Sequence, residues 1–322
     1  MNYSKKQAIA LVKKYYKPAF IRRHSVTFCT AGVVIVLYYL LIASSALTIY
    51  RRHSERPWTL LAERLFNYPS GIVNGHILSL SRYKLEVAAR MHYATVNNQP
   101  ANELQIGRLV MKQLIDRELY LEALQSRTII ITDADVQKRL DGISAQIGGE
   151  SKFKTFLNQS YGSQITEDQF RIWTREALAE SAVQYQILQR ATVRHILLAT
   201  SPDASPDVVE KTRKKLLDVK AKITGTDTFS VIAKQYSEDA ASRDQGGQLG
   251  TAVRGSDGPV ISVDFETAMF SQPVGQVSDP IRSPQGWHLI LVDKREGTIN
   301  ESLAEFTTEL RSAVGISQYI GL

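Results

Sequence analysis

The sequence is short of cysteine and, near its start, of acidic residues. Cys29 is the only cysteine among 322 residues, so no disulfide can form within the chain. A small fold stapled by disulfides is therefore excluded, and cysteine pairing does not reveal the redox compartment. Residues 1–24 contain seven lysines and arginines and no acid, and the rest of the chain has 32 basic and 32 acidic residues. The net charge of +7 thus belongs to the tail, and we expect no nucleic-acid partner.

Charge is then absent altogether from residues 25–50, an apolar run closed by Arg51 and Arg52. A membrane helix needs about 20 apolar residues, whereas the core of a signal peptide has only about 7 to 15. We therefore expect residues 25–50 to form an uncleaved single-pass transmembrane helix. The small residues 43–46 leave cleavage there as an open alternative. The positive-inside rule places residues 1–24 in the cytoplasm as a basic tail and the remainder outside the cell membrane.

A juxtamembrane linker is expected at residues 51–71. Residues 54–69 include Trp58, Leu61 and Phe66, which suit a short amphipathic helix. Such a helix could lie on the membrane surface or be the first packing helix of the exported part, and the sequence leaves both open.

Residues 72–191 have an almost entirely helical pattern. Apolar residues recur every three or four positions in Leu78–Val96 and Glu103–Leu124. Thr132 and Thr166 are followed by acids that favour a helix start, and Gly148-Gly149 favours a helix end. These signals predict an all-α bundle of about five helices joined by short polar turns.

Residues 192–297 alternate strand and helix patterns, which predicts an α+β domain with a small antiparallel sheet. Strands are expected at Val193–Leu198 and Gly286–Val292. Expected helices begin at Pro206 and run to Gly225, begin at Phe229 behind a Thr228 cap, and span Val263–Phe270. Residues 298–322 are expected to contain one amphipathic helix from Glu301 to Tyr319. It either packs back on the chain or makes an interchain contact, as in a homodimer.

Three motifs stand out in residues 192–297: His195 and His288 in apolar strands, the turn Tyr236-Ser237-Glu238-Asp239, and the loop Gly246-Gly247-Gln248-Leu249-Gly250. The order of these motifs resembles the parvulin (PpiC, rotamase) family of peptidyl-prolyl cis-trans isomerases. Residues 72–77, 114–119 and 131–136 are similar to the N-terminal chaperone region of SurA-type and PrsA-type foldases. A spacer bundle that binds no client is the alternative for this region.

The resemblance implies a site made of three catalytic residues and an apolar proline pocket. His195, Asp239 and His288 are the implied catalytic residues, with Asp239 accepting a hydrogen bond from an imidazole. Leu249, Ile261 and Phe265 are the implied substrate-binding residues, although core packing is an equal alternative for each. No metal or other cofactor is expected, because isomerisation requires preferential binding of a twisted amide rather than a metal. No nucleotide is expected either, because no Lys-Ser/Thr follows the glycines and no βαβ unit encloses them.

Several positions depart from the family pattern. Gln248 replaces a common acid, Thr251-Ala252 replace a common aromatic pair, and the loop 253–259 is longer than usual. Residues 200–205 contain no arginine, so recognition of phosphorylated substrates is not expected.

The expected function is that of a membrane-anchored, extracytoplasmic isomerase and folding factor, acting on unfolded or newly exported polypeptides that contain X-Pro bonds. The alternative is a catalytically weak binding chaperone that uses the parvulin-like domain as a docking module.

Overall fold

The structure is a computed structural model that describes residues 37–38, 40–46, 48–49, 66, 68–255 and 262–320. The predicted basic tail lies outside the described residues, as does most of the predicted linker. Within the predicted membrane span, the described residues 40–46 are helical. In the part of the chain that is described, no helix is both long and apolar enough to cross a bilayer. The span at residues 25–50 therefore stays a prediction.

The described residues fall into two compact units, the smaller of which contains most of a three-stranded sheet. Its strands are β1 (Pro69–Val73), β2 (His76–Ser79) and β7 (Ile316–Gln318), in the order β2-β1-β7. Asn74 and Gly75 turn the chain between β1 and β2 with φ angles of 47° and 86°. Positive φ at both central residues is the signature of a two-residue hairpin turn. The prediction that the helical pattern begins at Ile72 is therefore wrong at its start.

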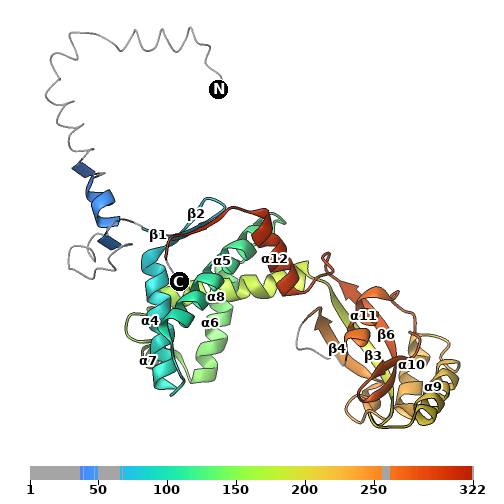
Figure 1. Ribbon diagram of the computed structural model, residues 1–322. Coiled ribbons are helices and arrows are strands. Elements are labelled where there is room, and N and C mark those ends of the chain that lie inside the picture. Colours follow the sequence, from blue (N-terminus) through green and yellow to red (C-terminus); the bar gives the residue numbers. More distant parts are fainter. Residues whose placement is uncertain are drawn as a thin grey trace, which may run out of the picture. The chain divides into compact units, whose positions relative to one another are not determined.

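The helical region belongs mainly to the larger unit and consists of five α-helices (Figure 1). They are α4 (Leu80–Val96), α5 (Glu103–Gln125), α6 (Asp133–Ile147), α7 (Glu150–Tyr161) and α8 (Glu167–Ala182). Thr132 and Thr166 cap α6 and α8 through their side chains, and Gly148 ends α6 at a φ of 101°. The predicted helix starts and the predicted end are thus present.

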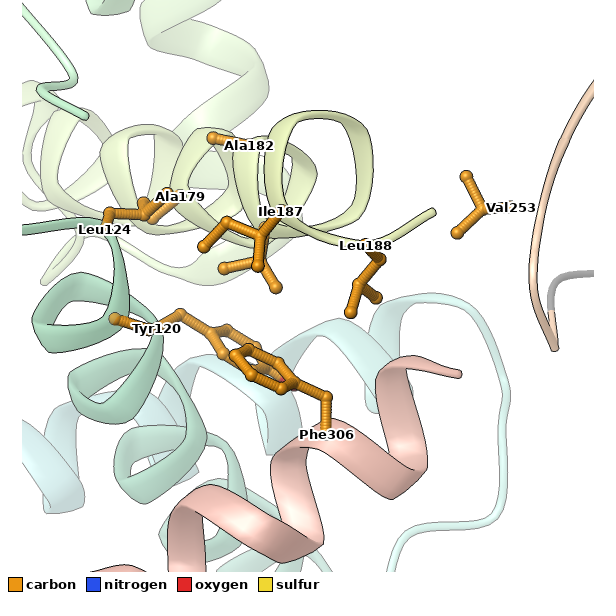
Figure 2. Packing of buried hydrophobic residues seen from close by; sticks show 10 residues of the cluster. Tyr120, Leu124, Ala179, Ala182, Ile187, Leu188, Val253 and Phe306 are labelled. Atoms are coloured by element: carbon orange, nitrogen blue, oxygen red, sulfur yellow. The ribbon is translucent and has the colours of Figure 1, made fainter. Parts of the chain in front are cut away.

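A π-helical turn, η1 (Val183–Ile187), leads from α8 toward the next strand. Its residues Val183 and Ile187 belong to a buried apolar cluster that also contains residues of α5, α8 and Phe306. Figure 2 shows this cluster, in which Phe306 lies beside Tyr120 and Leu188. Phe306 belongs to α12 (Leu303–Ala313), so this helix packs back on the chain. It ends at Ala313, and the residues after it form β7. The prediction of one helix up to Tyr319 is therefore wrong for its last turns.

The C-terminal part of the larger unit is a four-stranded sheet with helices on both faces (Figure 1). Its strands are β3 (Arg190–Ala199), β4 (Gln248–Val253), β5 (Ile281–Ser283) and β6 (Gly286–Glu296), all antiparallel in the order β4-β3-β6-β5. Its helices are α9 (Pro206–Lys220), α10 (Thr226–Tyr236), the 3-10 turn η2 (Arg243–Gln245) and α11 (Val263–Ser271). The α+β architecture with a small antiparallel sheet is confirmed.

Alternation along the strands divides this domain into two cores. Ile196 and Leu198 of β3 pack with Leu216 and Phe229 from α9 and α10. Val193 packs on the opposite face, with residues of α11. Because side chains alternate between the faces of a strand, His195 points to the α11 face.

The helix predicted to run from Pro206 to Gly225 is shorter than expected. α9 ends at Lys220, five residues before Gly225, and Gly225 instead serves as the N-cap of α10.

Candidate active site

The two predicted histidines lie against each other in the middle of the sheet. β3 and β6 are adjacent, and Cα pairing sets Leu197 opposite His288 and His195 opposite Ile290. The two imidazole rings are stacked at 5.3 Å between centroids, and their Nδ1 atoms are 3.2 Å apart. Both side chains are buried, with 3% of His195 exposed and none of the His288 residue.

Asp239 lies at the solvent-exposed end of this pair of histidines. Its Oδ2 lies 2.9 Å from His195 Nε2, and its side chain is 22% exposed. Ser242 adds a hydroxyl that donates to the same carboxylate oxygen and lies 3.0 Å from His195 Nε2. The structure therefore joins the three predicted catalytic residues in one hydrogen-bonded array.

The buried end of the array is Ser283 on β5. Its Oγ is 2.7 Å from His288 Nε2 and accepts a hydrogen bond from the Gln285 backbone N–H at 3.1 Å. Both nitrogens of each imidazole thus have a partner. Neither ring offers a nitrogen to a metal without breaking the array.

The order of protons along the array follows from the charge of Asp239. Burial raises the pKa of this carboxyl, but hydrogen bonds from Ser242, His195 and the backbone outweigh burial and hold the pKa below its usual value. Ionised Asp239 accepts the Nε2 proton of His195, which leaves His195 Nδ1 as an acceptor. His288 must then donate from Nδ1, and its Nε2 is an acceptor for the Ser283 hydroxyl, whose single proton can go either to this nitrogen at 2.7 Å or to the Gln285 side-chain oxygen at 2.8 Å.

Burial keeps both imidazoles neutral. It lowers the pKa of His195, although Asp239 opposes the shift. It also lowers the pKa of His288 to about 3, with a further contribution from His195. A second proton between the two Nδ1 atoms would set two N–H groups against each other in an apolar surrounding. The array therefore holds one negative charge, at Asp239, near neutral pH.

The glycine loop and the serine turn position these side chains. Gly247 accepts a hydrogen bond from His195 N–H at 2.8 Å and has a φ of 82°. A Cβ at this position would lie 2.2 Å from the His195 carbonyl oxygen, so only glycine fits. Ser237 Oγ accepts hydrogen bonds from the backbone N–H groups of Leu197 and Asp239, which ties the turn to β3.

The three predicted substrate-binding residues have different surroundings. Phe265 is fully buried and meets both imidazoles edge-on, at 6.2 Å from His195 and 5.4 Å from His288. Leu249 is partly buried against the same core. Ile261 lies outside the described residues. For Phe265 the structure shows packing beneath the histidines, and its contact with substrate stays a prediction.

Two residues of the array, Ser242 and Ser283, are missing from the sequence-based prediction. Serine is common in turns and at strand ends, so neither position stands out in a single sequence. The one local signal is the spacing of Ser242 three residues after Asp239, which is typical of a side chain that hydrogen-bonds back to an aspartate.

Comparison with known proteins identifies this part of the chain. The sequence model of the PPIC-type PPIase domain, a rotamase family, matches residues 195–294. These residues therefore form a peptidyl-prolyl isomerase domain of the parvulin type, which confirms the predicted enzyme class of the domain.

Proteins that are similar to this chain over more than the isomerase domain include foldases and chaperones. The chain is 29% identical over 201 residues to foldase protein PrsA 2 of Bacillus cereus, covering 57% of this chain and 64% of the relative. It is 28% identical to foldase protein PrsA of Geobacillus kaustophilus, covering 65% and 72%. It is 24% identical to chaperone SurA of Hydrogenovibrio crunogenus, covering 77% and 59%. The chain thus spans less than two thirds of the first and third of these relatives.

Among solved structures, a peptidyl-prolyl isomerase (PrsA) from Bacillus anthracis is 23% identical, with 63% of this chain and 86% of that chain covered and a TM-score of 0.27.

Proposed function

We propose that this protein is a membrane-anchored, extracytoplasmic peptidyl-prolyl cis-trans isomerase and folding factor for exported polypeptides. The isomerase activity is supported by one observation, the continuous hydrogen-bonded array in the isomerase domain. It runs from Asp239 through His195 and His288 to Ser283. The names of the PrsA and SurA relatives support the folding role.

The array suits isomerisation better than bond cleavage. Rotation about an X-Pro bond must break amide resonance, at a cost of about 18 to 20 kcal/mol. The planar amide carries more negative charge on its oxygen than the twisted amide does. A carboxylate that faces this oxygen therefore destabilises the planar state relative to the twisted one, which lowers the barrier. In this proposal Asp239 faces the substrate, and the neutral histidines hold its geometry and charge from below.

The test is a rate measurement on a proline-containing tetrapeptide with the full chain in detergent. Wild-type protein is expected to accelerate isomerisation, and Asp239→Ala is expected to lose at least about tenfold, or about 1.4 kcal/mol of transition-state stabilisation. Asp244→Ala is the matched control, because Asp244 lies in the same loop, is 76% exposed and pairs with Arg243 rather than with the array. Equal rates for all three proteins would refute the site.

The helical region offers a place for client side chains. A pocket of about 890 Å³ lies among its helices, within the size range of ligand sites. Aromatic rings form much of its wall: Tyr93 stacks on Tyr161 at 5.6 Å, and Trp173 meets Tyr161 edge-on at 5.6 Å. Arg117 is also part of the lining and pairs with two buried acids, Glu86 at 2.8 Å and Glu176 at 3.2 Å. We propose that apolar segments of unfolded chains enter this pocket.

The membrane anchor and topology rest on the sequence. Residues 25–50 contain no charged residue, and seven cations precede them. We propose a cytoplasmic N-terminus, with the helical region and the isomerase domain outside the cell membrane. External protease applied to spheroplasts, in which the outer layers of the envelope no longer shield the cell membrane, should then degrade the isomerase domain but spare an epitope fused before residue 1. Protection of the isomerase domain would contradict this topology.

The second candidate is a binding chaperone with weak isomerase activity. The sequence departures at Gln248 and in the longer loop 253–259 favour it, because Gln248 begins β4 directly after Gly247, which bonds to the His195 backbone. It predicts that the protein suppresses client aggregation while Asp239→Ala has no effect on either aggregation or isomerisation.

A further inference from the structure

A second cluster of ligating side chains lies far along the chain from the isomerase site. His76 begins β2, and Glu118 and Glu122 lie one turn apart on α5. His76 Nδ1 is 3.3 Å from a Glu118 oxygen, and His76 Nε2 is 3.7 Å from Glu122 Oε1. One ligating atom from each residue can be chosen so that all three lie within 4.8 Å of one another.

One pair of these donors has the spacing found in a metal coordination sphere. Zn²⁺ binds imidazole nitrogen and carboxylate oxygen at about 2.0 to 2.2 Å, so two donors of a tetrahedral site are about 3.3 to 3.5 Å apart. The separation of His76 Nδ1 from Glu118 lies in this range. Because 61% of the His76 side chain is exposed, its ring can turn to bring Glu122 into the same sphere.

One oxygen of the cluster lacks a donor. Glu122 Oε1 is shielded from solvent and accepts no hydrogen bond among the described residues. In the described part of the chain, the basic side chain that lies within 4.0 Å of the Glu118 and Glu122 carboxylates is His76. Like charges at positions i and i+4 of a helix repel each other. A shielded carboxylate oxygen beside a second carboxylate therefore favours a cation in their midst.

The surrounding backbone holds the donors in place. The Asn74-Gly75 turn sets the direction of β2, and the Asn74 backbone N–H donates to the Gly315 carbonyl at 2.9 Å. The Asn74 side chain donates to Glu122 Oε2 at 3.1 Å, which leaves Oε1 for the cluster. Such hydrogen bonds orient the carboxylates of metal sites.

We propose that His76, Glu118 and Glu122 form a binding site for a divalent transition-metal ion, with Zn²⁺ as the best match. One imidazole and two carboxylates suit Zn²⁺ and its neighbours in the first transition row better than Mg²⁺, which prefers a full set of oxygen ligands. The bound ion would fasten the β1–β2 turn to α5. This site is independent of the proposed isomerase activity.

Equilibrium dialysis of the full chain against Zn²⁺, with bound metal counted by mass spectrometry, tests the proposal. Wild-type protein is expected to hold one equivalent that His76→Ala and Glu118→Gln each weaken at least tenfold. His92→Ala is the control, since His92 is also exposed on the helical region and its Nε2 lies 3.0 Å from the Gln159 carbonyl. Glu118→Gln keeps the shape of the side chain, so its loss of metal does not arise from unfolding.

Co²⁺ provides a second readout. Co²⁺ bound in a tetrahedral or five-coordinate site should give visible absorption bands, which His76→Ala removes and His92→Ala keeps. Unchanged Zn²⁺ binding in His76→Ala and Glu118→Gln, or no saturable binding by wild-type protein at 100-fold molar excess, would overturn the proposal.

Discussion

Replacing His288 with asparagine should make the isomerase domain less sensitive to acid. His288 is fully buried, and burial lowers its pKa to about 3 from an ordinary value of 6.5. In the unfolded chain His288 therefore binds a proton as the pH falls through 6.5, whereas in the folded chain it does so only near pH 3. His288 thus contributes stability above pH 6.5 that is lost progressively as the pH falls toward 3.

The size of the effect follows from the shift. Each proton that only the unfolded state binds lowers the free energy of unfolding by about 1.4 kcal/mol for every pH unit of acidification. Between pH 6.5 and pH 4, His288 alone should lower the free energy of unfolding by about 3 kcal/mol. His288→Asn removes this titration, while the asparagine amide can still donate to His195 Nδ1. The variant should be less stable at pH 7, because the contact between the Ser283 hydroxyl and the His288 ring is lost, but its stability should fall less steeply below pH 6.5.

Urea unfolding monitored by a single tryptophan measures the difference. Trp287 precedes His288 on β6 and donates from Nε1 to the Val209 carbonyl at 3.0 Å, so it reports on this domain. Replacing Trp58 and Trp173 with phenylalanine isolates its signal. Equal pH slopes for this background and for the same background with His288→Asn would refute the claim that His288 is buried in the neutral form.

Four further predictions concern the same domain and its neighbours. Gly247→Ala should abolish isomerase activity and cost more than about 2 kcal/mol of stability, because the new Cβ meets the His195 carbonyl; chemical denaturation measures this cost. Ser283→Ala should cost about 1 to 3 kcal/mol in the same experiment, since His288 Nε2 loses its donor in a buried place. Phe306→Ala should lower thermal stability by about 3 to 5 kcal/mol and leave the rate on a tetrapeptide unchanged, as Phe306 packs outside the site. Because hydrogen bonds hold the pKa of Asp239 below its usual value and burial lowers the pKa of His195, that rate should be constant from pH 7 to pH 8; a fall with an apparent pKa inside this range would contradict an ionised Asp239 beside neutral histidines.

Local sequence signals predict most of the helices but not the three-stranded sheet β2-β1-β7. Thr132 caps α6 in a reciprocal arrangement with Asp135, which follows from residues three apart. β7 has no comparable signal, because its three residues become a strand only by pairing with a segment more than 200 residues away. The β1–β2 hairpin did have a signal, since Asn-Gly between apolar residues is typical of a two-residue turn. The helical pattern of the following residues obscured it.

The site was predictable as a set of motifs but not as a hydrogen-bonded array. Two histidines in apolar strands and an aspartate in a serine turn indicate which residues meet. The offset of His195 and His288 depends on strand register, which a single sequence does not specify. Burial of Phe265 depends likewise on how α11 packs. Whether Phe265 contacts substrate therefore could not be decided from its residue type.

The central claim is that one chain both binds unfolded clients and isomerises their X-Pro bonds. The most direct test is the catalysed refolding of a denatured protein whose slow phase is prolyl isomerisation, compared with the rate on a tetrapeptide. We predict that Asp239→Ala loses both activities, whereas Trp173→Ala, in the wall of the helical pocket, loses catalysis on the protein substrate and keeps it on the tetrapeptide. A wild-type chain that accelerates neither reaction, or a Trp173→Ala variant with full activity on both substrates, would contradict the account.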